Sequence, residues 1–474
     1  MIPDRFAPVL AELAPLAERF SAAGHRLYLV GGTVRDLMVD SGRTDHDLDL
    51  STDARPPEIK RCLGGWADAV WTQGERFGTI GAKVGDRTYE ITTFRAESYT
   101  DDSRKPHVTY ADDVETDLSR RDFTVNAMAL ELTAGAAPML VDPHGGALDL
   151  MNKVLRTPLG PEVSFSDDPL RMLRAARFIA GYQLQPTEQL VSAVTAMASR
   201  LDIVSAERIR DEFDKLMIVD HPGVGLWFLF DTGLSDRFLP ELSAMRLEHD
   251  PIHRHKDVLS HTIAVVENVR PMAEQPVERP PFDFRIVRLA ALFHDIGKPR
   301  TRGHQEGKGT TFHHHDAVGA RMTKKRMTEL RYSNDDVAKV TALVALHLRF
   351  HTYRLGWSDS AVRRYVRDAD DLLHELNVLT RCDCTTRNER KAQQLSKRMD
   401  DLEERIDALA EAEELAAIRP ELDGKAVMDH LGIAPGREIG EALDFLLEIR
   451  LEEGLIGEAE SKARLDEWWA RRSR

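Results

Sequence analysis

Strand-like and helical patterns divide this chain near residues 155–165. A helix is expected over 1–24, and between 26 and 155 strand-like runs then alternate with helical ones. The strand-like runs are "RLYLV", "DLDL", "TIGAKV", "RTYEITTF", "NAMALEL" and "APMLVD". Beyond about 160 long helical patterns dominate, and the join "TPLGP" has the prolines and glycine of a linker. The sequence therefore predicts a multidomain α+β protein, with an N-terminal α/β head containing a mixed sheet and an all-α body.

Length and composition narrow the class of protein. A chain of 474 residues suggests two to four domains, and 42% apolar with 30% charged residues is typical of soluble globular proteins. No apolar run approaches the roughly 20 residues of a membrane span, and no secretory signal is visible. Three cysteines are too few for a disulfide framework, so a cytoplasmic location is expected. The net charge of −15 argues against a nucleic-acid-coated surface but allows a local basic groove.

The segment "LVGGTVRD" ends a predicted buried strand in Gly31 and Gly32 and then starts a helix. Glycine lets the backbone approach a ligand closely, and the free N–H groups at a helix start suit a phosphate. Arg35, one turn further on, is placed to contact the same anion. An ordinary strand–turn–helix is the alternative interpretation.

Two carboxylates share one face in "DLDL". Side chains alternate along a strand, so Asp47 and Asp49 point the same way while the leucines point into the core. Such a pair repels unless a cation lies between its members, and Mg²⁺ prefers oxygen ligands. Glu90, in "RTYEITTF", is a candidate third carboxylate on a neighbouring strand. The alternatives are a solvated strand end for the aspartates and an exposed strand position for Glu90.

Two further stretches combine arginines with carboxylates. In "SRRDFTVNAMAL", Asp122 and Asn126 suit a ribose hydroxyl and the preceding arginines suit a triphosphate. In "SDDPLRMLRAARF", Asp168 can cap the helix that Pro169 begins. Arg171 in the first turn opposes the helix dipole, which indicates a role other than helix stability. Arg171, Arg174 and Arg177 are predicted to form one basic helix face that binds nucleotide.

Histidines are concentrated in the middle of the chain, where 11 of 18 lie between residues 249 and 351. The segment "FHDIGK" places His294 and Asp295 side by side at the end of an apolar helix. Imidazole and carboxylate together suit a transition metal that generates hydroxide for phosphoester hydrolysis.

The order of these motifs over about 28–180 resembles the class II tRNA nucleotidyltransferase and bacterial poly(A) polymerase family. The resemblance implies a nucleotidyltransferase-type palm. There Asp47 and Asp49 bind catalytic Mg²⁺, and the nucleotide is bound by residues in three motifs: Gly31, Gly32, Arg35, Arg121, Asp122, Asn126, Asp168 and Arg171. Asp168 and Arg171 would bind the Watson–Crick edge of the incoming base. This sequence has Asp167 where the family usually has Glu, so a helper role for that position is in doubt.

The histidine-rich segment resembles the HD-domain phosphohydrolases. The resemblance implies a minimal metal set of His261, His294, Asp295 and Asp383, to which His315 and His347 are added in a dinuclear site. One sequence does not decide among His313, His314 and His315, and a degenerate, tRNA-facing domain is the alternative. HD domains are fused to many CCA-adding members of the family, which favours CCA addition over poly(A) synthesis.

Four domains are expected: a palm over 1–157, a helical neck over 158–248, an HD domain over 249–385 and a helical tRNA-binding region over 386–474. The expected activity is template-independent addition or repair of the tRNA 3′-CCA end, which uses CTP, ATP and Mg²⁺ and contacts the 3′ end and acceptor arm of tRNA. A transition metal is expected in the HD domain, and no membrane contact. The rivals are a poly(A) polymerase or one half of a split CC- and A-adding pair, and an HD phosphohydrolase whose head only binds nucleotides.

Overall fold

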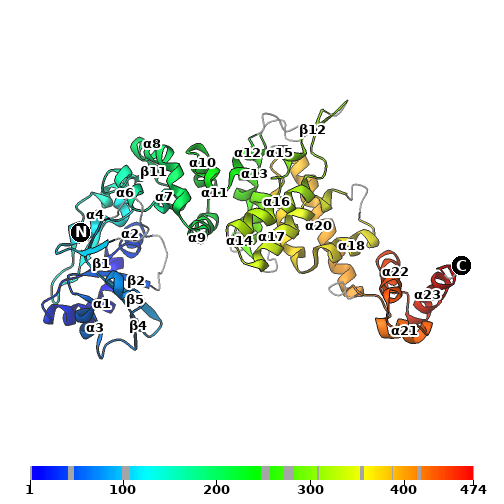
Figure 1. The fold of residues 1–474 in the computed structure, drawn as a ribbon, viewed down its shortest axis with the longest axis horizontal. Helices are drawn as coiled ribbons and strands as arrows, with labels where there is room; N and C mark the ends of the chain where they lie inside the picture. Colours follow the sequence, from blue (N-terminus) through cyan, green and yellow to red (C-terminus); the bar gives the residue numbers. More distant parts are fainter. Residues whose placement is uncertain are drawn as a thin grey trace. The chain divides into compact units, whose positions relative to one another are not determined.

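The structure, a computed structural model, describes residues 3–40, 47–98, 107–246, 257–271, 282–306, 309–352, 357–386, 388–413 and 418–472. The chain forms two compact units, Met1–Phe238 and Leu239–Arg474. The first contains the sheet and the second is almost entirely helical (Figure 1). The predicted α+β class is thereby confirmed. The finer boundaries at 157 and 385 stay predictions, and the one at 248 lies outside the described residues.

A seven-stranded mixed sheet forms the centre of the first unit, in the order β3-β4-β5-β2-β1-β8-β9. The β2–β5 pair is parallel and the other neighbouring pairs are antiparallel. The strands are β1 Leu27–Val30, β2 Asp47–Thr52, β3 Ala69–Trp71, β4 Thr79–Val84, β5 Arg87–Thr93, β8 Ala129–Glu131 and β9 Met139–Val141. All six predicted strand-like runs are present in this sheet.

Alternation along β2 positions its carboxylates. Leu48 and Leu50 are each only 1% exposed, while Asp47 and Asp49 are exposed on the opposite face, as predicted. The parallel register pairs Asp49 with Glu90 of β5. Glu90 is therefore on the neighbouring strand, as the sequence indicated.

Of the strands in the first unit, the predicted set omits β3, β6 and β7, and also the short strands β10 Val154–Leu155 and β11 Gln185–Pro186, which pair in parallel. The edge strand β3 is three residues long and exposed throughout, so it has no burial pattern to detect. The strands β6 Arg95–Ser98 and β7 His107–Tyr110 pair with each other in a separate two-stranded sheet. Their sequences, "RAES" and "HVTY", are mostly polar and give no strong alternation.

Helices cover the sheet and form the neck of the first unit. They are α1 Ala7–Ala22, α2 Gly32–Val39, α3 Pro56–Leu63, α4 Val114–Ser119, α5 Gly146–Met151, α6 Pro161–Asp167, α7 Leu170–Tyr182, α8 Glu188–Met197, α9 Ala206–Met217, α10 Gly223–Asp231 and α11 Ser235–Phe238. Helix α7 packs against both α9 and α10. The prediction of one long helix in "PLRMLRAARFIAGY" is confirmed within one residue of its start.

The second unit surrounds the buried helix α14. Its helices are α12 Pro240–Ala244, α13 Val258–Asn268, α14 Phe284–Phe293, α15 Lys298–Thr301, α16 His315–Glu329, α17 Asn334–Leu346, α18 Asp359–Ala369, α19 Leu373–Cys382, α20 Glu389–Ala412, α21 Gly424–Leu431, α22 Arg437–Glu453 and α23 Glu458–Arg472. A hairpin of β12 Gly303–Gln305 and β13 Gly309–Thr311 interrupts them. Helix α14 contacts α13, α17 and α19, which brings the histidine-bearing ends of several helices together.

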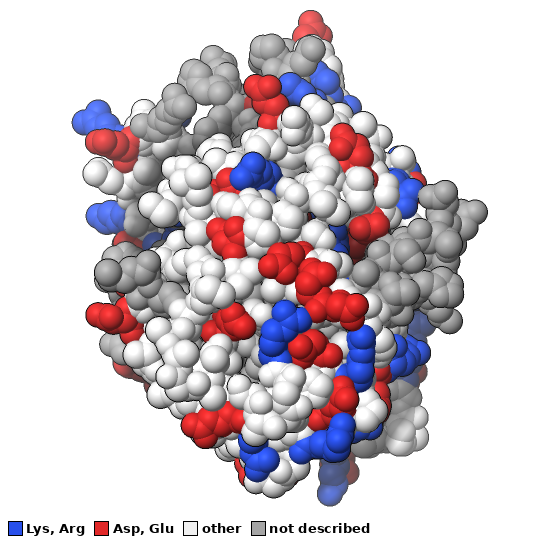
Figure 2. All heavy atoms as spheres, turned by 90° about the vertical axis from the view of Figure 1, so that its left-hand side faces the viewer, with Lys and Arg blue, Asp and Glu red and all other residues white. Residues whose placement is uncertain are grey.

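The surface carries mixed charge. On the face shown in Figure 2, acidic and basic side chains are interspersed among the residues that the structure describes, and no continuous basic area covers that face. None of the helices in the described ranges combines the length and the apolar character that crossing a bilayer requires.

Candidate active site and candidate metal centre

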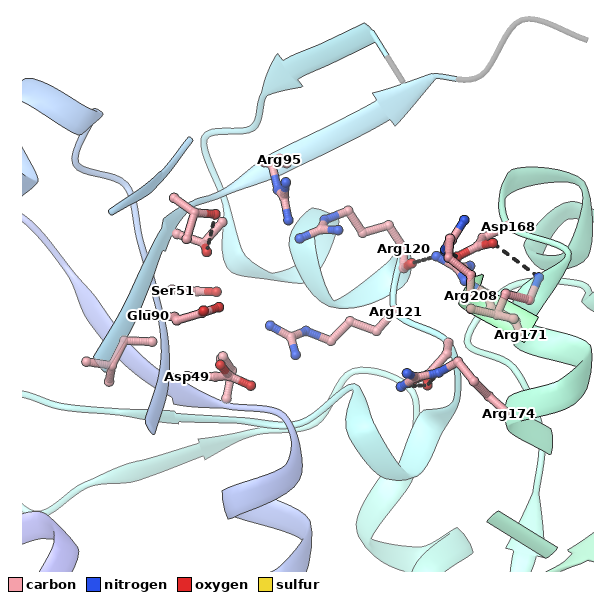
Figure 3. A pocket seen from close by; sticks show the side chains of 16 residues that line it. Asp49, Ser51, Glu90, Arg95, Arg120, Arg121, Asp168, Arg171, Arg174 and Arg208 are labelled. Atoms are coloured by element: carbon pink, nitrogen blue, oxygen red, sulfur yellow. Dashed lines mark hydrogen bonds and ion pairs between the residues drawn. The ribbon is translucent and has the colours of Figure 1, made fainter. Parts of the chain in front are cut away.

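A pocket of about 370 Å³ lies in the first unit between the sheet and the helices that follow it (Figure 3). Four carboxylates and six arginines line it: Asp49, Glu90, Asp122 and Asp168, with Arg95, Arg120, Arg121, Arg171, Arg174 and Arg208. Arginines outnumber carboxylates although the whole chain is acidic. The pocket is therefore a local basic site suited to a polyanion.

The acidic end of the pocket is built by β2 and β5. Burial raises the pKa of the Glu90 carboxyl, and the negative charges of Asp49 and Asp47 raise it further. Asp47 is two residues from Asp49 on the same face of β2, but it does not line the pocket itself. These three carboxylates form a cluster whose mutual repulsion a bound cation would relieve.

The backbone at Gly31 approaches this cluster closely. Gly31 has φ +75°, a conformation that side chains disfavour, and it precedes α2. A Cβ atom there would lie 3.2 Å from Arg121 Nη1 and 3.3 Å from Asp49 Oδ2. The predicted glycine turn is therefore present, and Gly32 is the first residue of α2. The turn lies beside Asp49, the predicted metal ligand, and Arg121, a predicted triphosphate ligand.

Asp117 of α4, which the sequence reasoning missed, holds the arginine pair in place. Its side chain is fully buried and lies 3.0 Å from Arg120 Nη2 and 3.5 Å from Arg121 Nη2. The Arg95 backbone N–H and the Ser51 hydroxyl also donate to it. Burial would raise the pKa of Asp117, but the two guanidinium groups hold it below its usual value. The spacing of three and four residues in "TDLSRR" was the available signal.

Asp122 is the centre of a second buried network. It accepts hydrogen bonds from Asn126 Nδ2 at 2.9 Å and from Arg174 Nε at 2.8 Å. Burial alone would raise the pKa of Asp122, yet the charge of Arg174 and the Asn126 hydrogen bond hold it well below its usual value. Asp122 and Arg174 line the pocket, whereas Asn126 lies behind them. The predicted ribose-binding pair is therefore brought together, with only one member on the pocket wall.

Arg35 is outside the pocket, and its predicted contact with the triphosphate is not supported. Its guanidinium donates to both Asp36 oxygens, at 2.9 and 2.8 Å, and to Asn126 Oδ1 at 2.5 Å. The ring of Tyr182 lies 4.2 Å from Arg35 Cζ, and the Tyr182 hydroxyl donates to Asp36. Helix α2 turns this side chain away from the glycine turn toward α7, so Arg35 connects the head to the neck.

Arg177, predicted as part of the basic face, also lies outside the pocket. Its guanidinium pairs with the buried carboxylate of Glu212 on α9. An α-helix has about 3.6 residues per turn, so arginines spaced three residues apart shift gradually around the helix. Arg171 and Arg174 therefore line the pocket, whereas Arg177 does not.

The base-selecting pair predicted on α7 lines the opposite end of the pocket. Asp168 accepts from the Leu170 backbone N–H at 3.1 Å. The N-cap of α7 is Pro169, and not Asp168 as the sequence predicted, because the helix begins one residue later than expected. Arg171 donates to the Arg120 carbonyl at 2.6 Å and to Ser164 Oγ at 2.8 Å. Arg208 of α9, missed from the sequence, donates to Asp168 at 2.8 Å. No pattern in the amphipathic sequence of α9 distinguishes Arg208 from a solvated arginine.

A candidate metal centre lies in the second unit, where all six predicted residues meet. They form two groups, each with its ligand atoms within 4.8 Å of one another: His261, His294 and Asp383, and Asp295, His315 and His347. Asp295 connects them, because one of its oxygens lies 3.2 Å from His294 Nε2 and the other 3.4 Å from His315 Nε2. His313 and His314 are exposed and absent from both groups, so His315 is the histidine that the fold brings in.

Each imidazole of the centre is oriented through its outer nitrogen. The Nδ1 atoms of His294, His315 and His347 lie 2.7–2.8 Å from backbone carbonyl oxygens, and His261 Nδ1 lies 2.8 Å from Thr385 Oγ1. With Nδ1 as donor to a carbonyl, Nε2 carries the lone pair that points inward. Inward Nε2 lone pairs are the arrangement that metal binding requires.

The donor set fits two divalent cations. Asp295 Oδ2 and Asp383 Oδ1 are both buried, and they face cationic or imidazole groups: Lys298 Nζ lies 2.7 Å from the first and His261 Nε2 lies 2.9 Å from the second. Burial, together with the charge of the neighbouring His294, lowers the pKa of His347 to about 4. Burial also opposes charge on His294, but Asp295 raises the pKa of His294 to about 9.

Family models match three parts of the chain. A model described as "Poly A polymerase head domain" matches 27–156, and one described as "Probable RNA and SrmB- binding site of polymerase A" matches 183–245. A third, described as "HD domain", matches 258–412. The first covers the pocket's sheet and the third covers the whole metal centre.

Curated relatives match at moderate identity. The chain is 34% identical over 450 residues to the A-adding tRNA nucleotidyltransferase of Deinococcus radiodurans, covering 93% of this chain and 95% of that protein. It is 38% identical over 234 residues to the CCA-adding enzyme of Lactobacillus helveticus, covering 49% and 56% of the two chains. The match to the Deinococcus protein therefore includes both units.

Solved structures share the fold. The CCA-adding enzyme of Bacillus stearothermophilus in complex with CTP superposes with a TM-score of 0.67 at 22% identity, covering 99% of both chains. The Thermotoga maritima CCA-adding enzyme complexed with tRNA gives 0.61 at 19% identity, covering 98% of this chain and 97% of that one.

Asp117→Asn is expected to destabilise the first unit by about 3–5 kcal/mol at pH 7, because it leaves Arg120 and Arg121 without their buried counter-charge. The pKa of Asp117 is lower in the folded than in the unfolded chain. Its stabilising charge is therefore fully present above the unfolded pKa of about 4 and is lost as the pH falls further. Urea unfolding of wild type and variant should show a difference that shrinks between pH 4 and pH 3. Glu115→Gln, an exposed position on the same helix, is the control. A difference that does not depend on pH would contradict this account.

Asn126→Asp is expected to destabilise the first unit by about 1–3 kcal/mol, although it changes one atom. The amide donates to Asp122 and accepts from Arg35, and an ionised carboxylate cannot donate. Thermal unfolding should show the loss, with Asn152→Asp, an exposed position at the end of α5, as the control. Equal melting temperatures for Asn126→Asp and wild type would contradict a stabilising role for the hydrogen bonds that connect Arg35, Asn126 and Asp122.

Proposed function

This chain belongs to the tRNA nucleotidyltransferase family, and we propose that it adds or repairs the 3′-CCA end of tRNA from CTP and ATP. The observation that carries the proposal is the pocket with Asp49 and Glu90 at one end and Asp168 with Arg171 at the other. A site that transfers a nucleotide from a nucleoside triphosphate needs metal-binding carboxylates and cationic side chains around the phosphates. It also needs, at the other end of the nucleotide, polar groups that recognise the base. The relative aligned over 95% of its length is also named for nucleotide addition to tRNA.

We infer that Asp47 and Asp49 hold Mg²⁺, with Glu90 as a third carboxylate beside them. Bound there, the ion supplies activation of the 3′-hydroxyl and neutralises charge on the leaving pyrophosphate. Arg120 and Arg121, held by Asp117, supply guanidinium donors for the triphosphate. The positive φ of Gly31, and Gly32 after it, leave room for the phosphates beside Asp49. Asp122 on the pocket wall supplies an acceptor for a ribose hydroxyl.

Base selection is assigned to Asp168 and Arg171. A carboxylate accepts from the exocyclic amine of C or A, and a guanidinium donates to ring acceptors. G and U present the wrong pattern, and a buried partner left unpaired costs about 1–3 kcal/mol. Arg208 would act as a positioning residue, since its 2.8 Å contact holds the Asp168 carboxylate.

The tRNA is proposed to contact the helical segments beyond the palm, since the model matching 183–245 is described as a probable RNA-binding site. Recognition would rely on the shape and backbone of the 3′ end and acceptor arm, as is usual for structured RNA. Helices α21–α23 are proposed as part of the tRNA-binding region. The expected cytoplasmic location stays a prediction.

Addition of the terminal A alone is the second candidate for the palm. The specific observation in its favour is the A-adding enzyme of Deinococcus radiodurans, whose length is matched almost fully, whereas the CCA-adding enzyme of Lactobacillus helveticus is matched over about half of its length. Both candidates use the same residues and differ in the nucleotides accepted. Poly(A) synthesis is a third possibility within the family.

For the second unit we propose metal-dependent hydrolysis of a phosphoester. The six gathered ligands and their oriented imidazoles support it. A transition metal is the proposed ion, because four of the six ligands are imidazoles. Bound there, such an ion supplies hydroxide at neutral pH.

Full CCA synthesis predicts a defined product. On tRNA ending before CCA, CTP alone should extend the RNA by two nucleotides, and CTP with ATP by three, as resolved on a sequencing gel. Asp47→Ala with Asp49→Ala should abolish extension, and Asp86→Ala, at an exposed turn of the same sheet, should leave it intact. Extension only of tRNA already ending in CC would support the A-adding candidate. Long A tracts, or extension by the double variant, would refute the proposed function.

His294→Ala is expected to abolish hydrolysis of p-nitrophenyl phosphate and to lower the metal content of the purified chain, while nucleotide addition continues. The reason is that His294 belongs to the metal centre of the second unit and does not line the arginine-rich pocket of the first unit. Elemental analysis measures the metal directly, and His313→Ala, an exposed histidine outside the centre, is the matched control. Unchanged metal content in His294→Ala would contradict the assignment.

A further inference from the structure

The metal centre opens into a cavity of about 640 Å³ in the second unit. One wall of this cavity is formed by α20, which contributes Lys391, Leu395 and Arg398. Spacings of four and three residues place these side chains on one face of the helix. Lys397, the neighbour of Arg398, does not line the cavity and is exposed. Helix α20 carries several basic residues near its start, but only those on one face, Lys391 and Arg398, line the cavity.

Arg398 is held in position by an aromatic ring. Its guanidinium carbon lies 4.9 Å from the centre of the Phe350 ring, and Phe350 is fully buried. Such a contact restricts the orientation of a long side chain. Leu348 and Leu395 add apolar wall beside it. The cavity therefore has a metal-binding floor, two cations on one side and an apolar surface suited to an organic group.

The charges favour a dianion. Lys298, which lies 2.7 Å from Asp295, adds a third cation to Lys391 and Arg398. The two carboxylates at the cavity belong to the donor set for metal ions, so cations predominate once the donors are satisfied. A phosphomonoester carries close to two negative charges at pH 7, because its second pKa is about 6, whereas a phosphodiester carries one. The volume lies within the range of about 300–1,000 Å³ that is usual for pockets that bind small molecules.

We propose that Lys391 and Arg398 bind the phosphate of a small phosphomonoester of mononucleotide size and hold it over the metal centre. The proposal rests on the phosphohydrolase function proposed above and names its substrate class. In the hydrolysis, the oxygen of water bonds to phosphorus and the phosphorus–oxygen bond to the alcohol breaks. A proton from the water passes to the leaving oxygen, so the products are an alcohol and inorganic phosphate.

Cys384 offers a local reporter of binding, because it lines the same cavity and is partly buried. Alkylation of Cys384 by iodoacetamide at pH 8.5 is followed by peptide mass spectrometry in the full-length, Mn²⁺-loaded chain. Inorganic phosphate and AMP are expected to slow the alkylation, and dimethyl phosphate, a monoanion, to slow it much less. A 5′-phosphorylated trinucleotide distinguishes an RNA end from a free mononucleotide. This readout is independent of the arginine-rich pocket in the first unit.

In the double variant Lys391→Ala with Arg398→Ala, the AMP concentration for half-protection is expected to rise roughly 100-fold, about tenfold for each lost ionic hydrogen bond. Arg398→Lys should recover part of the loss, and Lys397→Ala should match wild type. The KM for p-nitrophenyl phosphate should rise in the same order with kcat little changed, and nucleotide addition should be unaffected.

Equal half-protection in wild type and the double variant, or no protection of wild type by phosphate or AMP, would overturn the proposal. Stronger protection by dimethyl phosphate than by AMP would overturn the choice of a monoester. Protection that depends on Lys391 and Arg398 in a chain without hydrolysis would support the phosphate site and refute only the phosphohydrolase function. Circular dichroism of each variant, with Arg398→Lys as the conservative change, separates lost binding from lost folding.

Discussion

Two buried carboxylates organise the arginine-rich pocket. Asp117 pairs with Arg120 and Arg121, and Asp122 pairs with Arg174. Guanidinium groups crowded together repel one another and, when exposed, sample many rotamers, so an arginine-lined site requires fixed counter-charges behind it. The cost of burying Asp117 and Asp122 is offset by several hydrogen bonds to each. The result is a pre-organised cationic wall whose remaining donors face the pocket.

The same networks couple the sheet to the neck. From Arg35 on α2, hydrogen bonds run through Asn126 and Asp122 to Arg174 on α7. Tyr182, at the end of α7, donates a hydrogen bond to Asp36 of α2, and its ring lies over the Arg35 guanidinium. Because α7 begins next to Asp168, these contacts connect the sheet to the helix that borders the Asp168 end of the pocket. Arg35 is part of this connection and is not among the residues that line the pocket.

Local patterns in the sequence identified the parts that depend on one strand or one helix. The alternation in "DLDL" predicted the shared face of Asp47 and Asp49, and the buried leucines between them confirmed it. The pairing of Asp49 with Glu90 depends on the parallel register between β2 and β5. Alternation within each strand predicts which side chains share a face, but it does not determine which residues of two strands lie opposite each other. Arg35 and Arg177 were expected to bind nucleotide because an arginine near a phosphate motif has the same sequence signature whether it faces the ligand or a buried carboxylate. Asp117 had a local signal in its spacing to the arginine pair, whereas Arg208 reaches Asp168 only through the packing of α9 on α7.

The two sites differ in the sign of the charge that they favour in a ligand. In the first unit the fold places cations around a small acidic cluster, so a bound polyanion would supply the negative charge that the arginines lack. In the second unit imidazoles surround two buried carboxylates, and the charge of Asp295 raises the pKa of His294 to about 9 despite burial, so this cluster favours a positive charge such as a proton on His294. A divalent cation at the second site would displace that proton, because metal and proton compete for the same Nε2 lone pair. Metal affinity there is therefore coupled to pH through His294, whereas the arginines of the first site stay charged at every physiological pH.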